Sequence, residues 1–330
     1  MNMIRYATIG TGWIVQEFIQ GAELVDGLSL SAVYSRNTDT GERFAAKFGS
    51  PEVYTDLCKL AESNKIDAVY IARPNALHYK QSKLFLEQGK HVICEKPITV
   101  TPKEHDELAD LALKKGLIYM EAIMMLHLPA RKRLHEALGK IGNITTARFD
   151  FSQYSSKYGI FLDGGLPNIF NPELATGCLM DLGIYPIYAA LDLFGVPERV
   201  VTTAGFLSSG TDGFGNSVFV YEDKQVNLSY SKIGQSMLGS EIIGDKGTIV
   251  IPSISKLIDM KIVYHDGTAE ILTGNTQKYE LMSHEARSFF RYITDYDTYQ
   301  AEYQCNYHLS QSVSRQLEQM RIQAGIQFTG

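Results

Sequence analysis

The sequence predicts a two-domain α/β protein in which a doubly wound parallel sheet is followed by a second α/β part with a large, mostly antiparallel open sheet. The chain has 330 residues, which exceeds the usual size of a single hydrophobic core. Between residues 4 and 120, short apolar runs alternate with helix-length segments, and beyond them strand-like runs follow one another directly. These observations indicate βαβ units followed by hairpins.

The first part has the pattern of a parallel sheet with crossover helices. Its strand-like runs are Ile4–Ile9, Leu28–Tyr34, Ala68–Ala72, His91–Cys94 and Leu117–Met120. The helix-length segments between them are Trp13–Leu24, Thr38–Phe48, Leu57–Ser63, Ala76–Gln88 and Pro102–Lys115. Because strands that alternate with helices pair in parallel, we expect a doubly wound sheet here.

The second part has a different pattern. Its strand-like runs are Ile144–Tyr154, Arg199–Phe206, Asn216–Tyr221, Gln225–Ser231, Glu241–Gly244, Thr248–Ile251, Leu257–Tyr264 and Ala269–Leu272. Its helix-like stretches are Leu128–Leu138, Cys178–Phe194, Tyr279–Thr294 and Glu302–Ala324. Hairpin signals such as Asp266-Gly267 indicate antiparallel pairing. We therefore expect one domain over residues 1–122 and a second over residues 123–330.

Composition limits the classes of partner. A hydrophobic share of 45% and a charged share of 21% are typical of a globular protein. The net charge of −6 argues against a nucleic-acid or anionic-membrane surface. No apolar run is long enough for a membrane span, and the N-terminus resembles a strand rather than a signal peptide. The four widely spaced cysteines are expected to be reduced packing residues, no cluster indicates a metal, and a cytoplasmic location fits best.

A glycine turn joins the first strand to the first helix. It comprises Gly10, Thr11, Gly12, Trp13 and Ile14. Gly10 permits a tight turn, and Gly12 lets the backbone approach a pyrophosphate at a helix N-terminus with unpaired N–H groups. Gly-x-Gly is common in loops, but here it lies where a Rossmann dinucleotide site requires it.

The end of the second strand bears on the choice of dinucleotide. A chain specialised for NAD usually carries Asp or Glu here, which accepts a hydrogen bond from the ribose 2′-OH. This chain has Ser35 and Arg36, and a hydroxyl with a guanidinium suits a 2′-phosphate. The alternative is an ordinary exposed loop arginine. We expect NADP as the cofactor, with NAD as the second candidate.

Further motifs make the chain resemble a known family. They are Pro74-Asn75-x-x-His78, Glu95-Lys96-Pro97 after the run His91–Cys94, and Gly177-Cys-Leu-Met-Asp181-Leu-Gly-Ile-Tyr185-Pro. Together with the glycine turn, they resemble the Gfo/Idh/MocA oxidoreductases. The branch that they resemble most is that of dimeric dihydrodiol dehydrogenase and NADP-dependent D-xylose dehydrogenase. The resemblance extends over nearly the whole chain.

The resemblance implies a set of site residues. Lys96, Asp181 and Tyr185 would lie beside the nicotinamide, and in other branches a His takes the place of Tyr185. Further cofactor contacts would come from Ala72, Pro74, Asn75, His78 and Glu95, as well as from Lys96. The resemblance also implies a small-molecule substrate such as a sugar, polyol or diol, and a homodimer or dimer of dimers in which a second subunit covers the open sheet.

The chemistry of hydride transfer agrees with these residues. An alcohol that gives its hydride to nicotinamide must also lose its hydroxyl proton, so an acid/base is needed while the cofactor carries the redox step. A phenol titrates near about 10, and a neighbouring ammonium such as that of Lys96 would favour the phenolate. Asp181 and Tyr185 are four positions apart, hence on one face of a helix. Packing roles are the alternative for each residue taken alone.

Three segments depart from the pattern or leave their role open. Relatives tend to carry Gly-Gly where this chain has Thr176-Gly177, and they carry an aromatic and an arginine in place of residues within Met124–Pro129. The second change bears on the substrate. The segment Tyr154–Tyr158 either contacts a polyol or is only a strand end leading into a loop, and His127 is expected to pack rather than catalyse.

The leading hypothesis is therefore an NAD(P)-dependent oxidoreductase acting on CH–OH groups of a sugar, polyol or diol. Two alternatives stay open at this stage. One is a non-catalytic dinucleotide-sensing regulatory protein with the same fold, and the other is the same chemistry on a small carbonyl compound. The substrate, its stereochemistry and the reaction direction stay open as well.

Overall fold

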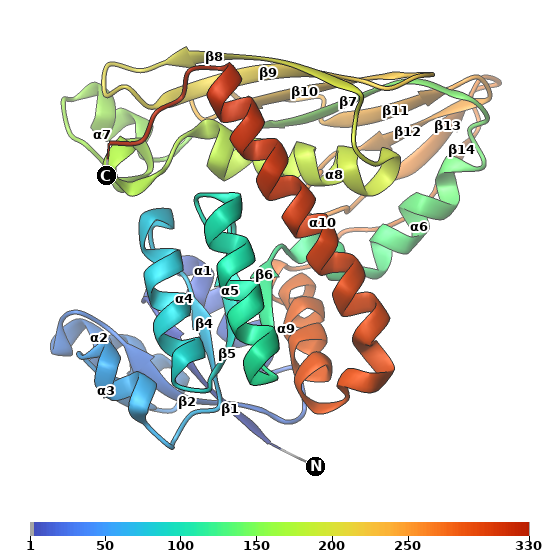
Figure 1. Ribbon diagram of the computed structural model, residues 1–330. Coiled ribbons are helices and arrows are strands. Elements are labelled where there is room, and N and C mark those ends of the chain that lie inside the picture. The colour runs from blue at the N-terminus through green and yellow to red at the C-terminus, as the bar shows by residue number, and fades with distance from the viewer. Residues whose placement is uncertain (1–2, 330) are drawn as a thin grey trace. The chain divides into compact units, whose positions relative to one another are not determined.

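The computed structural model describes residues 3–329 and divides into two units (Figure 1). Unit 1 holds the described residues up to His127 together with Gln277–His308, and unit 2 holds Leu128–Thr276 and the described residues from Leu309 onward. The expected boundary lay between residues 122 and 123, with all later residues in the second domain. The difference arises because residues 277–308 pack on the first sheet's helices. A Cβ on Gly21 would lie 2.7 Å from the Tyr279 carbonyl oxygen, so two helix backbones touch there.

Unit 1 is built from βαβ units. Its elements are β1 (Ile4–Ile9), α1 (Trp13–Ala22), β2 (Leu28–Tyr34), α2 (Thr38–Ala45), η1 (Ala46–Phe48), β3 (Glu52–Tyr54), α3 (Leu57–Glu62), β4 (Ala68–Ile71), η2 (Asn75–Leu77), α4 (His78–Glu87), β5 (His91–Glu95), α5 (Pro102–Lys115), β6 (Tyr119–Ala122), η3 (Met124–His127), α9 (Lys278–Thr294) and the first part of α10 (Tyr296–Gln323). All its strands pair in parallel, in the order β3-β2-β1-β4-β5-β6. The order reverses between β1 and β4, which is where such sheets bind ligands at their carboxyl edge.

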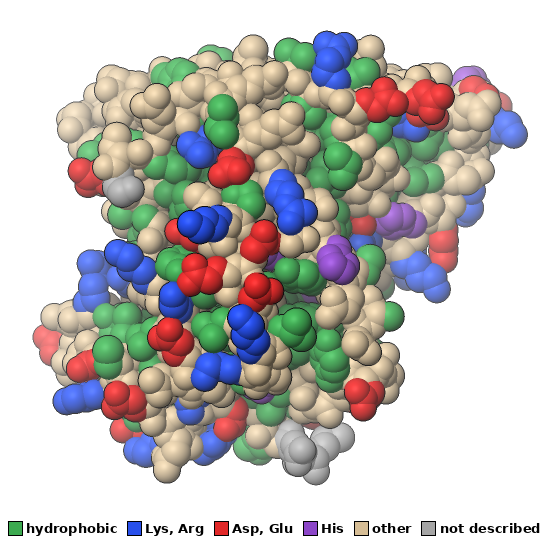
Figure 2. Space-filling model, viewed as in Figure 1, with side chains coloured by type: hydrophobic (Ala, Val, Ile, Leu, Met, Phe, Trp, Pro, Cys, Tyr) green, Lys and Arg blue, Asp and Glu red, His purple; other side chains and the backbone are tan. Residues whose placement is uncertain are grey.

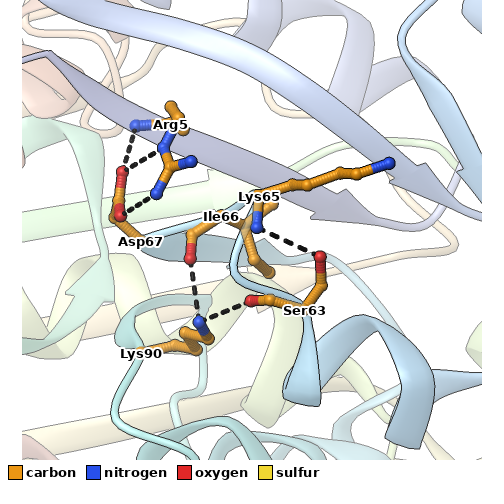
Figure 3. Close-up of polar contacts among 6 residues, drawn as sticks. All are labelled: Arg5, Ser63, Lys65, Ile66, Asp67 and Lys90. Carbon is orange, nitrogen blue, oxygen red and sulfur yellow. Dashed lines mark hydrogen bonds and ion pairs between the residues drawn. The ribbon is translucent and has the colours of Figure 1, made fainter.

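Polar side chains fix the other, amino edge of this sheet (Figure 3). Arg5 on β1 donates from Nε and from its terminal nitrogen to the Asp67 carboxylate at 3.0 and 2.7 Å. The Arg5 guanidinium lowers the pKa of Asp67 by hydrogen bonding and by charge. Lys90, just before β5, donates to the Ser63 and Ile66 carbonyl oxygens at 2.7 and 2.9 Å. These contacts fix the relative register of β1, β4 and β5, and hence where their carboxyl ends meet.

Unit 2 carries the second sheet. Its elements are α6 (Pro129–Leu138), β7 (Ile144–Ser152), α7 (Tyr158–Leu162), η4 (Asn168–Phe170), η5 (Pro172–Leu174), the π-helical η6 (Leu179–Gly183), α8 (Ile184–Phe194), β8 (Arg199–Phe206), β9 (Asp212–Val220), β10 (Gln225–Ser231), β11 (Ser240–Gly244), β12 (Gly247–Ile251), β13 (Lys261–Tyr264), β14 (Ala269–Ile271) and the end of α10. The strand order is β14-β13-β12-β11-β7-β10-β9-β8. Among the described strand pairs of unit 2, only β7–β10 is parallel, and α8 packs on β7 and β10. The predicted fold class is confirmed.

The stretch Pro172–Phe194 is long and apolar enough to span a membrane, although the sequence analysis predicted no membrane span. In the structure 78% of its most apolar window is buried against the rest of the protein. This is the behaviour of a core helix of a soluble protein. On the face shown in Figure 2, acidic and basic side chains lie interspersed rather than gathered by sign.

Candidate active site

The glycine turn lies at the switch point of the unit 1 sheet. Gly10 has φ +126°, and a Cβ at this position would lie 2.7 Å from the Ala72 carbonyl oxygen after β4. Only glycine fits there, because both the backbone conformation and the close approach exclude a side chain. A Cβ on Gly12 would meet no described atom within 4 Å, so the turn is open on that side.

Helix α1 begins directly after this turn and offers its first N–H groups. Its N-cap is Gly12, no side chain caps it, and its first turn has no acidic residue among the described side chains. Such a terminus favours a phosphate. Thr11 and Ile14 are half-buried, and Trp13 is exposed with the Lys278 ammonium 4.6 Å from its ring centroid. The turn therefore fits the pyrophosphate of a dinucleotide.

The residues after β2 and β4 bring two arginines to the carboxyl edge. Ser35 is buried, and its hydroxyl donates to the Asn37 carbonyl oxygen at 2.8 Å, whereas Arg36 is exposed. Burial and, to a smaller extent, the charge of Arg36 lower the pKa of Arg73. The Arg73 Nε is buried without a hydrogen-bond partner among the described atoms. Two cations after the strands that flank β1 at the carboxyl edge, one of them with an unsatisfied donor, fit an anion such as a 2′-phosphate.

The Lys96 loop follows β5. The Lys96–Pro97 peptide is cis. Glu95, which precedes Lys96, accepts a hydrogen bond of 2.5 Å from the Tyr70 hydroxyl. Burial raises the pKa of Glu95, and the charge of Lys96 offsets part of that rise. After the loop, the Ile98 N–H donates to buried Glu121 at 2.9 Å. Carboxylates on both sides thus fix the backbone that presents Lys96.

His78 lies behind the Lys96 loop. Its ring is fully buried, with Nδ1 2.8 Å from the Pro97 carbonyl oxygen and Nε2 2.7 Å from the Arg73 carbonyl oxygen. Both nitrogens are therefore engaged with backbone, and His78 ties the Lys96 loop to the segment after β4. Ala72, Pro74 and Asn75 lie on that segment, where all three are half-buried.

In unit 2, Asp181 and Tyr185 lie on one helical stretch. Asp181 belongs to the π-helical η6 and Tyr185 to the first turn of α8. The four-residue spacing predicted an α-helix over both residues, whereas only the part from Ile184 onward is α-helical. From Cys178 to Leu191 every described residue is buried except these two, which are half-buried. We call these two residues the exposed stripe, because they are the accessible part of an otherwise buried helix. π-Helical turns are frequent at functional sites.

Asp181 is paired with a cation that the sequence analysis did not identify. The Lys232 Nζ lies 2.9 Å from Asp181 Oδ2, and the Lys232 side chain is only 3% exposed. The same ammonium donates to the Ile169 carbonyl oxygen at 3.3 Å and lies 5.7 Å from the Phe170 ring centroid. A buried lysine requires a charge partner, and Asp181 supplies it. Lys232 directly follows β10, and no local motif marks it.

The start of the helical stretch requires a glycine and a buried acid. The Leu179 N–H donates to Asp212 Oδ2 at 2.6 Å, and burial raises the pKa of Asp212 to about 6. Gly177 has φ +142°, and a Cβ there would lie 1.9 Å from Asp212 Oδ1. Within Thr176-Gly177-Cys178, Gly177 is thus the glycine that the structure requires.

Aromatic side chains surround the Lys232–Asp181 pair. Tyr154 is 51% exposed and lies edge-on to Tyr158, with ring centroids 5.6 Å apart. Tyr158 contacts Phe170 at 5.9 Å, and the Ser155 N–H donates to the Lys232 carbonyl oxygen at 2.9 Å. Tyr185 lies edge-on to Phe151 at 5.1 Å. The segment Tyr154–Tyr158 therefore packs beside Lys232, through its backbone and through Phe170.

The segment Met124–Pro129 is apolar and largely inaccessible. Met124, Met125 and Leu126 are buried in η3. His127 is half-buried, with its ring centroid 6.4 Å from that of Tyr292, so it packs as expected.

All four cysteines are free, and Cys94 and Cys178 are buried.

Comparison with known proteins identifies both parts of the chain. Residues 4–123 match the family described as "Oxidoreductase family, NAD-binding Rossmann fold", and residues 130–250 match the "GFO/IDH/MocA C-terminal domain". A scyllo-inositol 2-dehydrogenase (NADP(+)) from Bacillus subtilis is 40% identical over 326 residues, which cover 99% of this chain and 98% of that protein.

More distant relatives share the chemistry or the fold. A trans-1,2-dihydrobenzene-1,2-diol dehydrogenase from Mus musculus is 31% identical over 63% of this chain and 62% of its own length. A crystal structure of a 3-ketoreductase from Actinomadura kijaniata with NADP and TDP-benzene superposes with a TM-score of 0.83 at 22% identity, covering 98% of each chain. At that identity the likeness shows the fold.

Proposed function

This chain belongs to the Gfo/Idh/MocA oxidoreductase family, and on that premise we propose that it is an NADP-dependent dehydrogenase of a cyclic polyol or sugar. The full-length similarity to an NADP-dependent scyllo-inositol dehydrogenase supports this class of substrate. The observation that carries the proposal is the exposed stripe of Asp181 and Tyr185, with Asp181 paired to nearly buried Lys232.

The cofactor is assigned to unit 1. The N–H groups at the start of α1 hold the pyrophosphate beside Gly10 and Gly12. Arg36 and Arg73 hold the 2′-phosphate, which gives the buried Arg73 Nε an acceptor and separates two like charges. Leaving the buried Nε of half-buried Arg73 without such an acceptor would be costly.

The reaction oxidises a secondary alcohol to a ketone. When bound beside Lys96, the nicotinamide would supply the hydride acceptor for oxidation at the carbinol carbon. The hydroxyl proton passes to the Tyr185 phenolate oxygen, so the substrate loses two electrons and two protons, one of them within the hydride. Lys96 stabilises the developing negative charge on the substrate oxygen. Reduction runs the same steps backwards.

Unit 2 also carries the proposed substrate contacts. A polyol presents several hydroxyl groups, and ionised Asp181 accepts from them while Lys232 keeps it charged and oriented. The faces of Tyr154 and Tyr158 contact the C–H faces of a ring. Lys232 acts through Asp181 and is a positioning residue.

Initial-rate measurements test the proposal. The panel consists of scyllo-inositol, myo-inositol, D-xylose and a vicinal diol, each with NADP and with NAD. We expect turnover of a cyclic polyol or sugar, with kcat/KM for NADP at least about tenfold above that for NAD. NADP binding without turnover of any of them would favour the dinucleotide-sensing alternative.

We also propose a cytoplasmic homodimer or dimer of dimers. Strands β8 and β9 carry exposed Val201 and Phe214 on the face opposite to α8, with 43% and 44% of their surfaces accessible. A second copy covering this face would bury them. Light scattering that finds a stable monomer at micromolar concentration contradicts the proposal.

A further inference from the structure

Unit 1 contains a cavity at the amino edge of its sheet, away from the nucleotide turn. Its volume is about 290 Å³. His91 at the start of β5, Ile118 just before β6, and residues of α5, α9 and α10 line it. Figure 1 shows where these elements lie in unit 1. Because the glycine turn follows the carboxyl end of β1, this cavity lies at the opposite edge of the same parallel sheet.

Tyrosine rings form much of its wall. Tyr303 lies edge-on to Tyr292 and Tyr296, with ring centroids 5.3 and 5.9 Å away. The hydroxyls are engaged elsewhere: Tyr303 donates to the Tyr119 carbonyl oxygen at 3.0 Å, and Tyr292 donates to Glu302 at 2.7 Å. The rings are therefore held in place, and they offer their π-systems rather than their hydroxyls.

Two polar side chains complete the cavity. The Ile118 N–H donates to His91 Nδ1 at 3.0 Å, and burial lowers the pKa of His91 to about 4. The imidazole is thus neutral at physiological pH and carries its proton on Nε2. Asp110 on α5 is then the charged side chain among the described lining residues, so the cavity has negative character.

We propose that this cavity binds a small organic ammonium ion with an aromatic body. Aromatic faces together with a carboxylate are the groups that recognise such cations. Since a cavity of about 150 Å³ can hold benzene, about 290 Å³ admits a bicyclic ring. The His91 Nε2–H is a donor for a hydroxyl or for a ring face of the ligand. A bound anion would meet the Asp110 charge without a lining cation to offset it.

Tryptamine and indole-3-acetate test the proposal, because they share a ring and differ in the sign of the charge. Isothermal titration calorimetry on the full chain should show tryptamine binding about five- to tenfold tighter than indole-3-acetate. Asp110→Asn should remove most of that difference. Leu113→Trp should block both ligands, since Leu113 lines the cavity yet is 74% exposed, so the larger side chain is tolerated by the fold.

Leu24→Trp is the matched control, because Leu24 is also an exposed leucine of unit 1 but lies outside the cavity. It should bind tryptamine as the wild type does. No saturable tryptamine binding at millimolar concentration, equal affinity for the two indoles, or binding that survives Leu113→Trp would each overturn the proposal. These outcomes do not depend on dehydrogenase activity.

Discussion

The nucleotide edge of unit 1 and the Asp181 site of unit 2 are built in different ways. The nucleotide edge is formed mainly by backbone groups. The Ala72 carbonyl oxygen occupies the space that a Cβ on Gly10 would need, and α1 presents N–H groups that no side chain caps. In unit 2, side chains from a helix and from the end of β10 meet as Asp181 and Lys232. The first kind of site recognises a phosphate group shared by many cofactors, and the second is suited to selecting one substrate.

The largest effect is expected at the proposed chemical step. Lys96→Met should lower turnover by about a hundred- to ten-thousand-fold, because it removes the charge that stabilises the substrate oxygen. The loss in a double variant with Tyr185→Phe should be far smaller than the product of the single losses. Multiplying losses would show that the two residues act independently.

The next effect concerns the 2′-phosphate. Arg73→Ala and Arg36→Ala should each raise the dissociation constant of NADP about ten- to a hundredfold and leave that of NAD nearly unchanged. Calorimetric titration measures both constants. Arg43→Ala is the control, because Arg43 is an exposed arginine on α2 that contacts the Asp39 carbonyl oxygen. If NAD binding falls as much as NADP binding, or if wild type binds both alike, the assignment is wrong.

A smaller effect is expected at Lys232. Lys232→Met should lower kcat/KM for the polyol about tenfold, because Asp181 loses its cation while remaining partly solvated. Lys232→Arg should restore kcat/KM in part, since it keeps the cation beside Asp181. A lower melting temperature with unchanged kcat/KM would mean that Lys232 only stabilises the fold.

The smallest effect on activity is expected at Asp212, where stability should respond instead. The pKa of this carboxyl is about 6 in the folded chain against an ordinary 3.8, so between these values the folded protein holds a proton that the unfolded chain has released. Stability therefore falls as pH rises through this window, by up to about 3 kcal/mol. Asp212→Asn should be less sensitive to pH over the same range in denaturant unfolding. Parallel curves for both proteins contradict the assignment.

The two regions also differ in how far sequence predicts them. The glycine turn and the place of Arg36 follow from local spacing, because each depends on neighbours in one βαβ unit. Arg73 was missed although it directly follows the run Ala68–Ala72, where a basic residue at a switch point is a usable signal. The motif that predicts His78 at the cofactor does not reveal that its ring is buried.

Unit 2 shows more clearly what the sequence alone does not predict. Asp181 and Tyr185 were found through a motif, whereas Lys232 lies 51 positions after Asp181 and meets it only through the sheet. The short edge strand β3 and the assignment of α9 to unit 1 were missed for a similar reason. A three-residue strand carries little periodicity, and helix packing on a distant sheet leaves no local pattern.

The central claim is that Tyr185 moves the proton while the nucleotide binds elsewhere. Tyr185→Phe removes one hydroxyl from a half-buried ring and leaves its contact with Phe151 in place. The decisive measurement is kcat on a polyol substrate together with the NADP dissociation constant of this variant. The account predicts a loss of kcat of about a hundred- to ten-thousand-fold with an unchanged dissociation constant. Near-wild-type kcat would contradict it, and would leave Tyr185 as a packing residue.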